Sequence, residues 1–378
     1  MKNSFILVLN SGSSSVKYAL FNLNKLKLVT KGLEENIGLP TGVKNHYEAL
    51  EKIFNLLIKE KYLTALRDIR AVGHRVVHGG EYFRKPVIIT SDVLQKIRDL
   101  SLMAPLHNPP NILGIETCQK LLPRVKNIAV FDTEFYSVLP REAYIYALPY
   151  EFYEQHKIRR YGFHGISHKY ISQEAQKVLK KEGGVKVHRM ITCHLGAGSS
   201  ITAILGGKPI DTSMGFTPLE GVVMTTRSGN IDPFIPLYLI NNLGYSAPEV
   251  DEILNKKSGY FGLCGLKDFR DILKQETDKS KLCYQVYLRS VVKYIGSYVA
   301  LLGGVEAIVF AGGIGEGSAK FRKEVMDNFK FLGVKIDERK NKQQAIIIST
   351  ANSKIKVLNI PTNEELMIAK EASIILKK

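Results

Sequence analysis

The strongest constraint on the fold of this chain is a pattern that occurs twice: an apolar run, a turn rich in glycine and serine, and a second apolar run. The first copy spans residues 5–21 with its turn at 11–15, and the second spans residues 189–205 with its turn at 196–200. Short apolar runs on either side of a small-residue turn are typical of β-hairpins. A hairpin is therefore predicted near the start of each half, and the repetition indicates two related lobes.

Amphipathic helices and further short strands follow each hairpin. Apolar residues on one helical face predict a helix over 48–61, and Ser167 is the expected N-cap of another that ends at 183–184. The segment 311–317 is expected to be a loop. Other predicted elements are strands at 71–78, 126–131, 307–310 and 355–360, and helices over 284–302, from 318 and after 361–365. This alternation predicts the α/β class.

The chain carries an excess of positive charge, with 53 Lys and Arg against 36 Asp and Glu and a net charge of +17. A basic surface suits nucleic acid or an anionic substrate. The basic residues are dispersed and form no run of five or more, so we expect no nucleic-acid partner. No apolar run is long enough for a signal peptide or a membrane span. The four cysteines lack disulfide or zinc spacing, and we expect a cytoplasmic protein without a membrane partner.

Three glycine-rich or serine-rich segments follow apolar strands, at 11–15, 196–200 and 311–317. Small residues let backbone N–H groups approach a phosphate closely. Any one of these segments alone is more simply a tight turn. Neither a P-loop nor the dinucleotide-binding spacing of glycines occurs, so the sequence predicts a phosphate-handling enzyme of another architecture.

Several charged and polar residues are candidates for phosphoryl-transfer chemistry. Arg75 lies on an apolar strand and requires an anionic partner, either a ligand or an internal carboxylate. Lys17 follows the first turn and is either a phosphate ligand or a surface lysine. Asp132 ends a predicted strand, and His164 and Arg227 lie in polar loops. Together they supply the cations and carboxylates that a kinase needs.

These motifs resemble those of the acetokinase family, within the superfamily of actin, Hsp70 and sugar kinases. The resemblance covers nearly the whole chain in the family's order, at residues 10–17, 73–81, 104–110, 130–133, 160–168, 192–200, 211–233, 268–271, 311–318 and 361–365. It implies two related actin-like (ribonuclease H-like) lobes with a nucleotide cleft between them. The implied lobes are 1–136 joined by the C-terminal helix 365–378, and 137–364, which binds the nucleotide.

The resemblance also implies an activity: reversible, Mg²⁺-dependent transfer of the γ-phosphoryl group of ATP to acetate, with Mn²⁺ as an alternative metal. ATP and ADP are substrates, and the family suggests a homodimer. A propionate or butyrate kinase is the alternative in the same class, since one methylene changes binding by only about 1 to 3 kcal/mol. An actin-like nucleotide-dependent binding module without catalysis is the alternative from another class.

Roles for individual residues follow from the same resemblance. Asn10 and Glu364 would hold the metal, and Asp132, His164 and Arg227 would be catalytic. Because the carboxylate of acetate carries no proton at neutral pH, we expect Asp132 to orient Arg75 or the metal instead of acting as a base. The substrate would be bound by Arg75, Val77, Leu106, Phe163 and Pro218. The ATP site would comprise Lys17, His194, Leu195, Gly196, Ala197, Gly198, Asp268, Phe269, Arg270, Gly313, Ile314, Gly315, Glu316 and Gly317.

The chain departs from the family pattern at three positions in the expected ATP loops. Ala197 replaces an asparagine, Thr225 replaces a glycine and Gly317 replaces an asparagine. The change at Ala197 removes a side-chain amide near the phosphates, and Thr225 restricts a loop that usually has the conformational freedom of glycine. The resemblance therefore implies less about nucleotide affinity and the choice of phosphoryl donor than about the chemistry of the acceptor.

Overall fold

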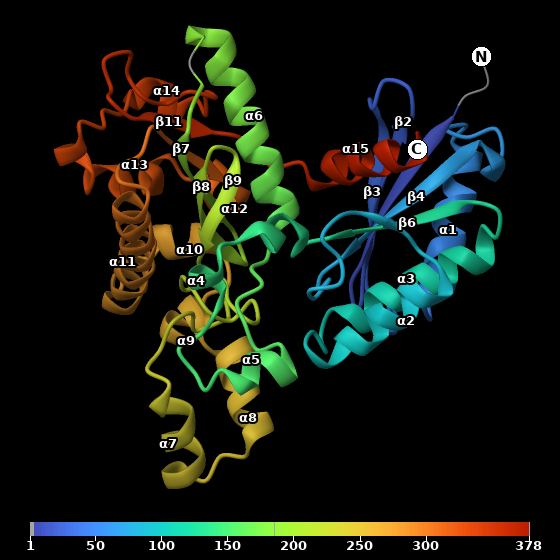
Figure 1. Ribbon diagram of the computed structural model, residues 1–378, viewed down its shortest axis with the longest axis horizontal. Helices are drawn as coiled ribbons and strands as arrows, with labels where there is room; N and C mark the ends of the chain where they lie inside the picture. The colour runs from blue at the N-terminus through green and yellow to red at the C-terminus, as the bar shows by residue number, and fades with distance from the viewer. Residues whose placement is uncertain (1–3, 185, 378) are drawn as a thin grey trace. The chain divides into compact units, whose positions relative to one another are not determined.

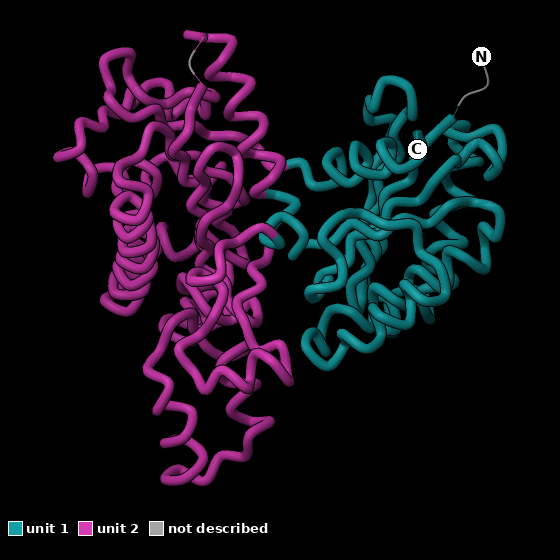
Figure 2. Tube along the Cα trace, in the orientation of Figure 1, with its two compact units in different colours: residues 1–137, 165–167, 363–378 teal, residues 138–164, 168–362 magenta. Residues whose placement is uncertain are grey.

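The computed structural model describes residues 4–184 and 186–377, and these form two compact units. Unit 1 comprises residues 1–137, 165–167 and 363–378, and unit 2 comprises residues 138–164 and 168–362 (Figure 2). The sequence placed the C-terminal helix with the first lobe, and the same helix clusters with unit 1 here. The short segment 165–167 also clusters with unit 1, although it interrupts the chain of unit 2.

Unit 1 is built on a mixed sheet with the strand order β3-β2-β1-β4-β6-β5. Strands β1, β4 and β6 run parallel, and β2, β3 and β5 are antiparallel to their neighbours. The strands are β1 (Phe5–Ser11), β2 (Val16–Asn22), β3 (Leu28–Glu34), β4 (Ile69–Val76), β5 (Val87–Ile88) and β6 (Lys126–Phe131).

Helices cover both faces of this sheet (Figure 1). They are α1 (His46–Lys59), α2 (Ser91–Asp99), α3 (Asn108–Leu121) and α15 (Glu364–Leu376). Helices α1 and α3 bury one apolar cluster against Leu7, Leu9 and Val72, whereas α15 packs on the other face. The glycine at Gly73 allows this close approach, because a Cβ there would lie 2.7 Å from Ile368 of α15.

Unit 2 contains a second mixed sheet, with the order β11-β10-β7-β8-β9. Its strands are β7 (Arg189–Leu195), β8 (Ser199–Leu205), β9 (Lys208–Thr212), β10 (Ala307–Ala311) and β11 (Lys356–Asn359). Strands β7, β10 and β11 are parallel, and β8 and β9 are antiparallel to their neighbours.

The helices of unit 2 lie partly against this sheet and partly away from it (Figure 1). They are α4 (Arg141–Tyr144), α5 (Glu151–His156), α6 (Gly165–Gly183, which starts in unit 1), α7 (Phe234–Leu243), α8 (Ala247–Glu252), α9 (Gly259–Cys264), α10 (Phe269–Lys274), α11 (Asp278–Leu301), α12 (Gly312–Gly317), α13 (Ala319–Asp327) and α14 (Glu338–Lys342). A large core of residues from α9, α10, α11, α13 and the sheet contains the rings of Tyr260, Phe269, Tyr284, Tyr287 and Phe321. Among the described residues, no helix is long and apolar enough to cross a membrane.

The two sheets share one strand order. In chain order, each begins with an antiparallel three-stranded meander, and its first strand then pairs in parallel with the fourth strand of the series. Beyond that fourth strand, β6 in unit 1 and β11 in unit 2 add in parallel, while β5 is an extra antiparallel edge strand of unit 1. This agreement confirms the two related α/β lobes that the repeated hairpin predicts.

Three local predictions were wrong. The segment 312–317 is the short helix α12 and not a loop. The N-cap of α6 is His164 instead of Ser167, and its backbone is left-handed with φ of 57°. Strand β4 ends at Val76, so His78 lies beyond it.

Candidate functional site

Unit 1 gathers polar side chains at one edge of its sheet. Asn10 lies near the end of β1, Arg75 near the end of β4, and Asp132 directly follows β6. These three strands are parallel, so their carboxyl ends meet at the same edge, where α/β proteins commonly bind ligands. Glu364, the first residue of α15, joins the same cluster.

Arg75 is the centre of this cluster. Its Nη2 lies 2.5 Å from Asp132 Oδ2, its Nη1 donates to Asn10 Oδ1 at 3.4 Å, and its Nε lies 3.9 Å from Glu364 Oε2. Burial opposes the charge on the guanidinium, but Asp132 and Glu364 outweigh burial and raise the pKa of Arg75. The internal carboxylate that the sequence left open as a partner is therefore present, and Asp132 holds Arg75 in place.

The same cluster suits a hard cation. Asp132 Oδ1 is buried and accepts no hydrogen bond from any described residue. Burial raises the pKa of Glu364 to about 7, although Arg75 partly opposes this, and a nearby cation would favour the ionised carboxylate. In the described part of the chain, no three His, Cys, Asp or Glu side chains form a metal-binding group.

Three further residues of unit 1 were expected at the site. The side chain of Lys17 is exposed on β2. It lies near enough to Glu364 for its charge to oppose, in small part, the rise in the pKa of that carboxyl. Val77 is buried, and its N–H donates to Asn111 Oδ1 at 3.1 Å. Leu106, by contrast, is 51% exposed. Of the two apolar residues of this unit expected to bind the substrate, the fold thus buries Val77 and leaves Leu106 exposed.

Unit 2 contains a cavity of about 630 Å³, which is a typical volume for a small-molecule site. Many of the residues expected to bind ATP line it. They are Gly196, Ala197, Asp268, Phe269, Arg270, Gly313, Ile314 and Gly317. The turn between β7 and β8, the start of α10, and α12 therefore meet around one space, although they are distant in sequence.

Other residues expected at the ATP site do not line this cavity. They are Lys17 of unit 1 and, in unit 2, His194, Leu195, Gly198, Gly315 and Glu316. Leu195 is fully buried in the core. Glu316 instead braces the backbone, because its Oε1 accepts from the N–H of Gly312 at 2.9 Å and from the N–H of Thr362 at 3.0 Å.

The three departures from the family pattern all lie on the wall of the cavity. The N–H of Thr225 donates to the carbonyl of Ala197 at 3.1 Å, so two of the changed positions are in direct contact. The hydroxyl of Thr225 also lies 2.5 Å from that of Tyr260. The threonine hydroxyl thus adds a contact with Tyr260 that a glycine does not provide.

His164 is held by a chain of buried hydrogen bonds. Its Nδ1 lies 2.9 Å from Ser200 Oγ, which in turn lies 2.7 Å from His168 Nε2. The other ring nitrogen of His168 lies 2.7 Å from Thr192 Oγ1. Burial holds the pKa of His168 well below its usual value, so its ring is neutral. This chain fixes the orientation of the His164 imidazole.

Arg227 lies near the same imidazole. A Cβ on Gly198 would lie 3.1 Å from the ring of His164 and 3.8 Å from Arg227 Nη1, so the two side chains converge on Gly198. Arg227 Nη1 contacts weak acceptors, the carbonyl of Pro218 at 3.4 Å and Met224 Sδ at 3.7 Å. Burial lowers the pKa of Arg227, and no carboxylate of the described residues forms an ion pair with it. A partly buried cation of this kind attracts an anion.

Sequence reasoning missed several residues that shape unit 2. Tyr260, Lys267, Leu273 and Ser318 line the cavity. Two of them lie at the edges of segments that were identified: Lys267 directly precedes 268–271, and Ser318 is the last residue of 311–318. Another missed group comprises Tyr146, Arg160 and Glu220, which are distant in sequence and interact only because the fold brings them together.

Comparisons with known proteins identify the relatives of this chain. A model of the acetokinase family matches residues 5–370. The acetate kinase of Carboxydothermus hydrogenoformans is 50% identical over 390 aligned residues, which cover 97% of this chain and 98% of that protein.

Solved structures give the same result. Acetate kinase from Porphyromonas gingivalis superimposes with a TM-score of 0.91 at 40% identity, covering 99% of this chain and 100% of the other. A propionate kinase from Francisella tularensis also has a TM-score of 0.91, at 43% identity, covering 97% and 98%.

Proposed function

Since this chain belongs to the acetokinase family, we propose that it is an acetate kinase, which transfers the γ-phosphoryl group of ATP to acetate and releases acetyl phosphate and ADP. The observation that carries this proposal is the convergence of His164 and Arg227, an arginine whose charge no described carboxylate balances, beside a glycine-lined cavity. A carboxylate oxygen attacks the γ-phosphorus while the bond to the bridging oxygen of ADP breaks. No proton is transferred, and the reaction is reversible.

We assign the transition-state role to Arg227 and His164. Phosphoryl transfer depends on in-line positioning and on donors around the equatorial oxygens. The guanidinium of Arg227 matches two oxygens at once, and its charge is available because its described partners are a carbonyl and a thioether. His164 is held by Ser200 through Nδ1, which directs Nε2 toward the space beside Gly198.

We assign the acceptor carboxylate to Arg75. Asp132 holds this guanidinium through one edge, and the other nitrogens remain near Asn10 and Glu364. Asp132 therefore orients Arg75, as expected from a substrate that carries no proton to remove. Val77, Leu106, Phe163 and Pro218 are our candidates for the apolar walls around the methyl group.

Mg²⁺ is the proposed metal, and Asn10 and Glu364 are its proposed ligands. The unpaired Asp132 Oδ1 beside them supports this assignment, because a buried carboxylate oxygen requires a cation or a donor. When bound, the metal supplies charge neutralisation for the phosphates. ATP and ADP would occupy the cavity of unit 2, with Lys17 directed at the phosphates.

A homodimer in the cytoplasm is our proposal for the working state of the protein. Helix α7 exposes Phe234, Leu237, Tyr238 and Leu243, each 48% to 62% exposed, and a second copy of this chain would cover them. Exposed apolar patches of this kind mark association surfaces. The cysteines are free thiols, which suits a reducing compartment.

Propionate is the runner-up acceptor, because a propionate kinase shares 43% identity and the fold with this chain. Trapping of acyl phosphates with hydroxylamine decides between the candidates, using ATP with acetate, propionate or butyrate, with and without Mg²⁺. We expect the highest kcat/KM with acetate and no product without the metal. Failure to form acyl phosphate from any of the three acids contradicts the kinase assignment.

Matched arginine variants test the proposed role of Arg227 in the same assay. Arg227→Ala should lower kcat by about a hundredfold or more, since it removes a cation from the transition state. Arg189→Ala serves as the control, because Arg189 is an arginine of the same unit that pairs with Glu306 at 3.4 Å away from the cavity. Equal activity of the two variants contradicts the role of Arg227.

A further inference from the structure

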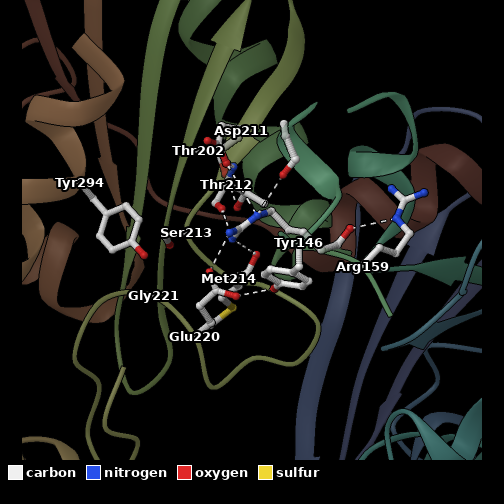
Figure 3. Close-up of polar contacts among 12 residues, drawn as sticks. Tyr146, Arg159, Thr202, Asp211, Thr212, Ser213, Met214, Glu220, Gly221 and Tyr294 are labelled. Atoms are coloured by element: carbon white, nitrogen blue, oxygen red, sulfur yellow. Dashed lines mark hydrogen bonds and ion pairs between the residues drawn. The ribbon is translucent and has the colours of Figure 1, made fainter. Parts of the chain in front are cut away.

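The loop 215–221 of unit 2 is held by a group that we call the Glu220 clamp, formed by Tyr146, Arg160 and Glu220. Arg160 Nη2 lies 2.7 Å from Glu220 Oε1. The hydroxyl of Tyr146 donates to Glu220 Oε2 (Figure 3). The same hydroxyl accepts from the N–H of Phe216 at 2.9 Å. One carboxylate is thus bound by two side chains from a different segment of the chain, and Tyr146 also holds the backbone of the loop.

Arg160 connects the clamp to the surrounding backbone. Its Nη1 donates to the carbonyl of Thr212 at 2.9 Å and to that of Met214 at 3.2 Å, and its Nε donates to the carbonyl of Ala143 at 3.2 Å. Asp211 Oδ1 is 4.0 Å from the same Nε. The Glu220 carboxylate overcomes the effect of burial and raises the pKa of Arg160. The side chain of Arg160 is only 17% exposed and directs its donors to protein groups, so it serves structure and not a ligand.

The clamp continues directly into the segment that contains two expected site residues. The N–H groups of Tyr161 and Gly162 donate to the carbonyl of Gly215, at 3.0 and 3.2 Å. Phe163 and His164 follow within two residues. The loop and the segment before His164 are therefore joined at the backbone by Gly215 and at the side chains by Glu220.

The other end of the loop holds the segment that contains Arg227. The N–H of Gly221 donates to Asn230 Oδ1 at 2.8 Å, and the N–H of Asn230 donates to the carbonyl of Gly221 at 2.9 Å. The carbonyl of Pro218 accepts from Arg227 Nη1 at 3.4 Å. One loop thus connects the segments of His164 and Arg227, and it carries Pro218 between these connections.

Gly215 shows how closely the clamp is packed. A Cβ at this position would overlap both Glu220 Oε2 and the hydroxyl of Tyr146. The φ of Gly215 is not in the left-handed region, so conformational freedom does not explain this glycine. Its absent side chain makes room for the carboxylate and the phenol.

We propose that Glu220 is a positioning residue that sets His164, Arg227 and Pro218 relative to one another, and so controls both the rate and the choice of carboxylic acid. The proposal rests on the acetate kinase function proposed above. Glu220 touches no reacting atom in this scheme. It acts through Arg160 and Tyr146 on the one side and through the loop 215–221 on the other.

The test compares Glu220→Gln with the wild-type enzyme. Glutamine keeps the shape but removes the charge that binds Arg160, and it presents an N–H₂ group to one of its two partners. We expect kcat with acetate to fall about tenfold to a hundredfold, as displacement of a catalytic group by roughly an ångström does. The ratio of kcat/KM for acetate over propionate should shift about threefold or more toward propionate, since Pro218 is a proposed wall.

Two measurements separate positioning from general destabilisation. Binding of ADP, measured by calorimetry, should be unchanged in Glu220→Gln, because no residue of the clamp lines the nucleotide cavity. Glu306→Gln is the matched control: Glu306 also pairs with an arginine of unit 2 and is similarly exposed, at 36% against 31% for Glu220. We expect the acid preference of Glu306→Gln to equal that of the wild-type enzyme.

Tyr146→Phe keeps the test decisive if Glu220→Gln folds poorly, because it removes one hydroxyl and leaves the ion pair with Arg160. It should shift the acid preference in the same direction, and its effect should be non-additive with that of Glu220→Gln. An unchanged acid ratio and kcat in both variants overturn the proposal, and so does an equal shift in Glu306→Gln. A wild-type enzyme that forms no acyl phosphate contradicts the proposed function itself, which is a different outcome.

Discussion

Arg75 and Arg227 are partly buried cations with opposite surroundings. Arg75 lies between Asp132 and Glu364, so its charge is largely balanced before any ligand binds. Arg227 contacts a carbonyl and a thioether, neither of which carries a full charge. A balanced guanidinium is well oriented for a small carboxylate, whereas an unbalanced one is suited to the larger charge of a phosphoryl group. The two proposed roles follow from this difference.

At the same scale, His74 predicts how stability depends on pH. It is buried, its Nε2 lies 2.7 Å from Asn127 Oδ1, and burial lowers its pKa to about 4. The unfolded chain takes up this proton near pH 6.5, before the folded chain does. The contribution of His74 to the free energy of unfolding is therefore complete above pH 6.5 and should fall by roughly 3 kcal/mol as the pH drops toward 4.

Urea unfolding between pH 7 and 4 measures this effect. His74→Gln keeps an N–H donor for Asn127 but cannot titrate, so its unfolding free energy should fall less steeply over this range than that of the wild-type protein. The control is His156→Gln, because His156 is exposed and has no buried ring to desolvate. Parallel curves for His74→Gln and the wild-type protein contradict the prediction.

At the scale of the element, side-chain hydrogen bonds stabilise helix α12 more than the helix propensity of its residues does. Its sequence contains four glycines, which are poor helix formers. Glu316 satisfies the N–H of Gly312 at its start, and the buried Arg322 donates to the carbonyls of Gly315 and Glu316 at 2.8 and 2.6 Å near its end. Helix propensity does not include such side-chain contacts, which explains why a loop was predicted here.

Gly312 is the residue on which this element depends most. Its φ is 76°, and a Cβ would lie 2.7 Å from the carbonyl oxygen of Leu195. Gly312→Ala should therefore displace α12 and weaken ADP binding about tenfold or more, in addition to a loss of stability of about 2 kcal/mol. Calorimetry and thermal unfolding measure the two effects.

Gly206→Ala is the control for this prediction. Gly206 also has a positive φ, 59°, but no atom lies within 4 Å of the position that a Cβ would occupy, and it belongs to the turn between β8 and β9. The Gly206→Ala variant should lose about 1 kcal/mol of stability from backbone strain and should bind ADP as the wild-type protein does. If both variants bind ADP like the wild-type protein, α12 does not form the nucleotide site.

At the scale of the whole molecule, helix α7 predicts association. None of its residues is buried, although most of them are apolar. Leu237→Glu together with Tyr238→Glu should convert the proposed dimer into monomers, because charges in an apolar interface are costly to desolvate. Sedimentation at micromolar concentration measures the mass. A wild-type protein that is already monomeric contradicts the proposal, as does a dimeric double variant.

The whole molecule also shows the value of the repeated hairpin as a predictor. Strands such as β6 and β7 have the bounds that the apolar runs indicated, 126–131 and 189–195. Burial of a short apolar segment between helical layers is a strong and local signal. The matching order of the two sheets then follows from the same pattern in each half.

The sequence by itself determined the α/β class, the two related lobes, and the family, because these depend on periodicity and on contiguous motifs. Only the tertiary structure decided that Ala197, Thr225 and Gly317 share one cavity. It alone also revealed the contact of Glu220 with Tyr146 and Arg160. These contacts join residues tens of positions apart, and a side chain's partners across the fold depend on packing that no local spacing records.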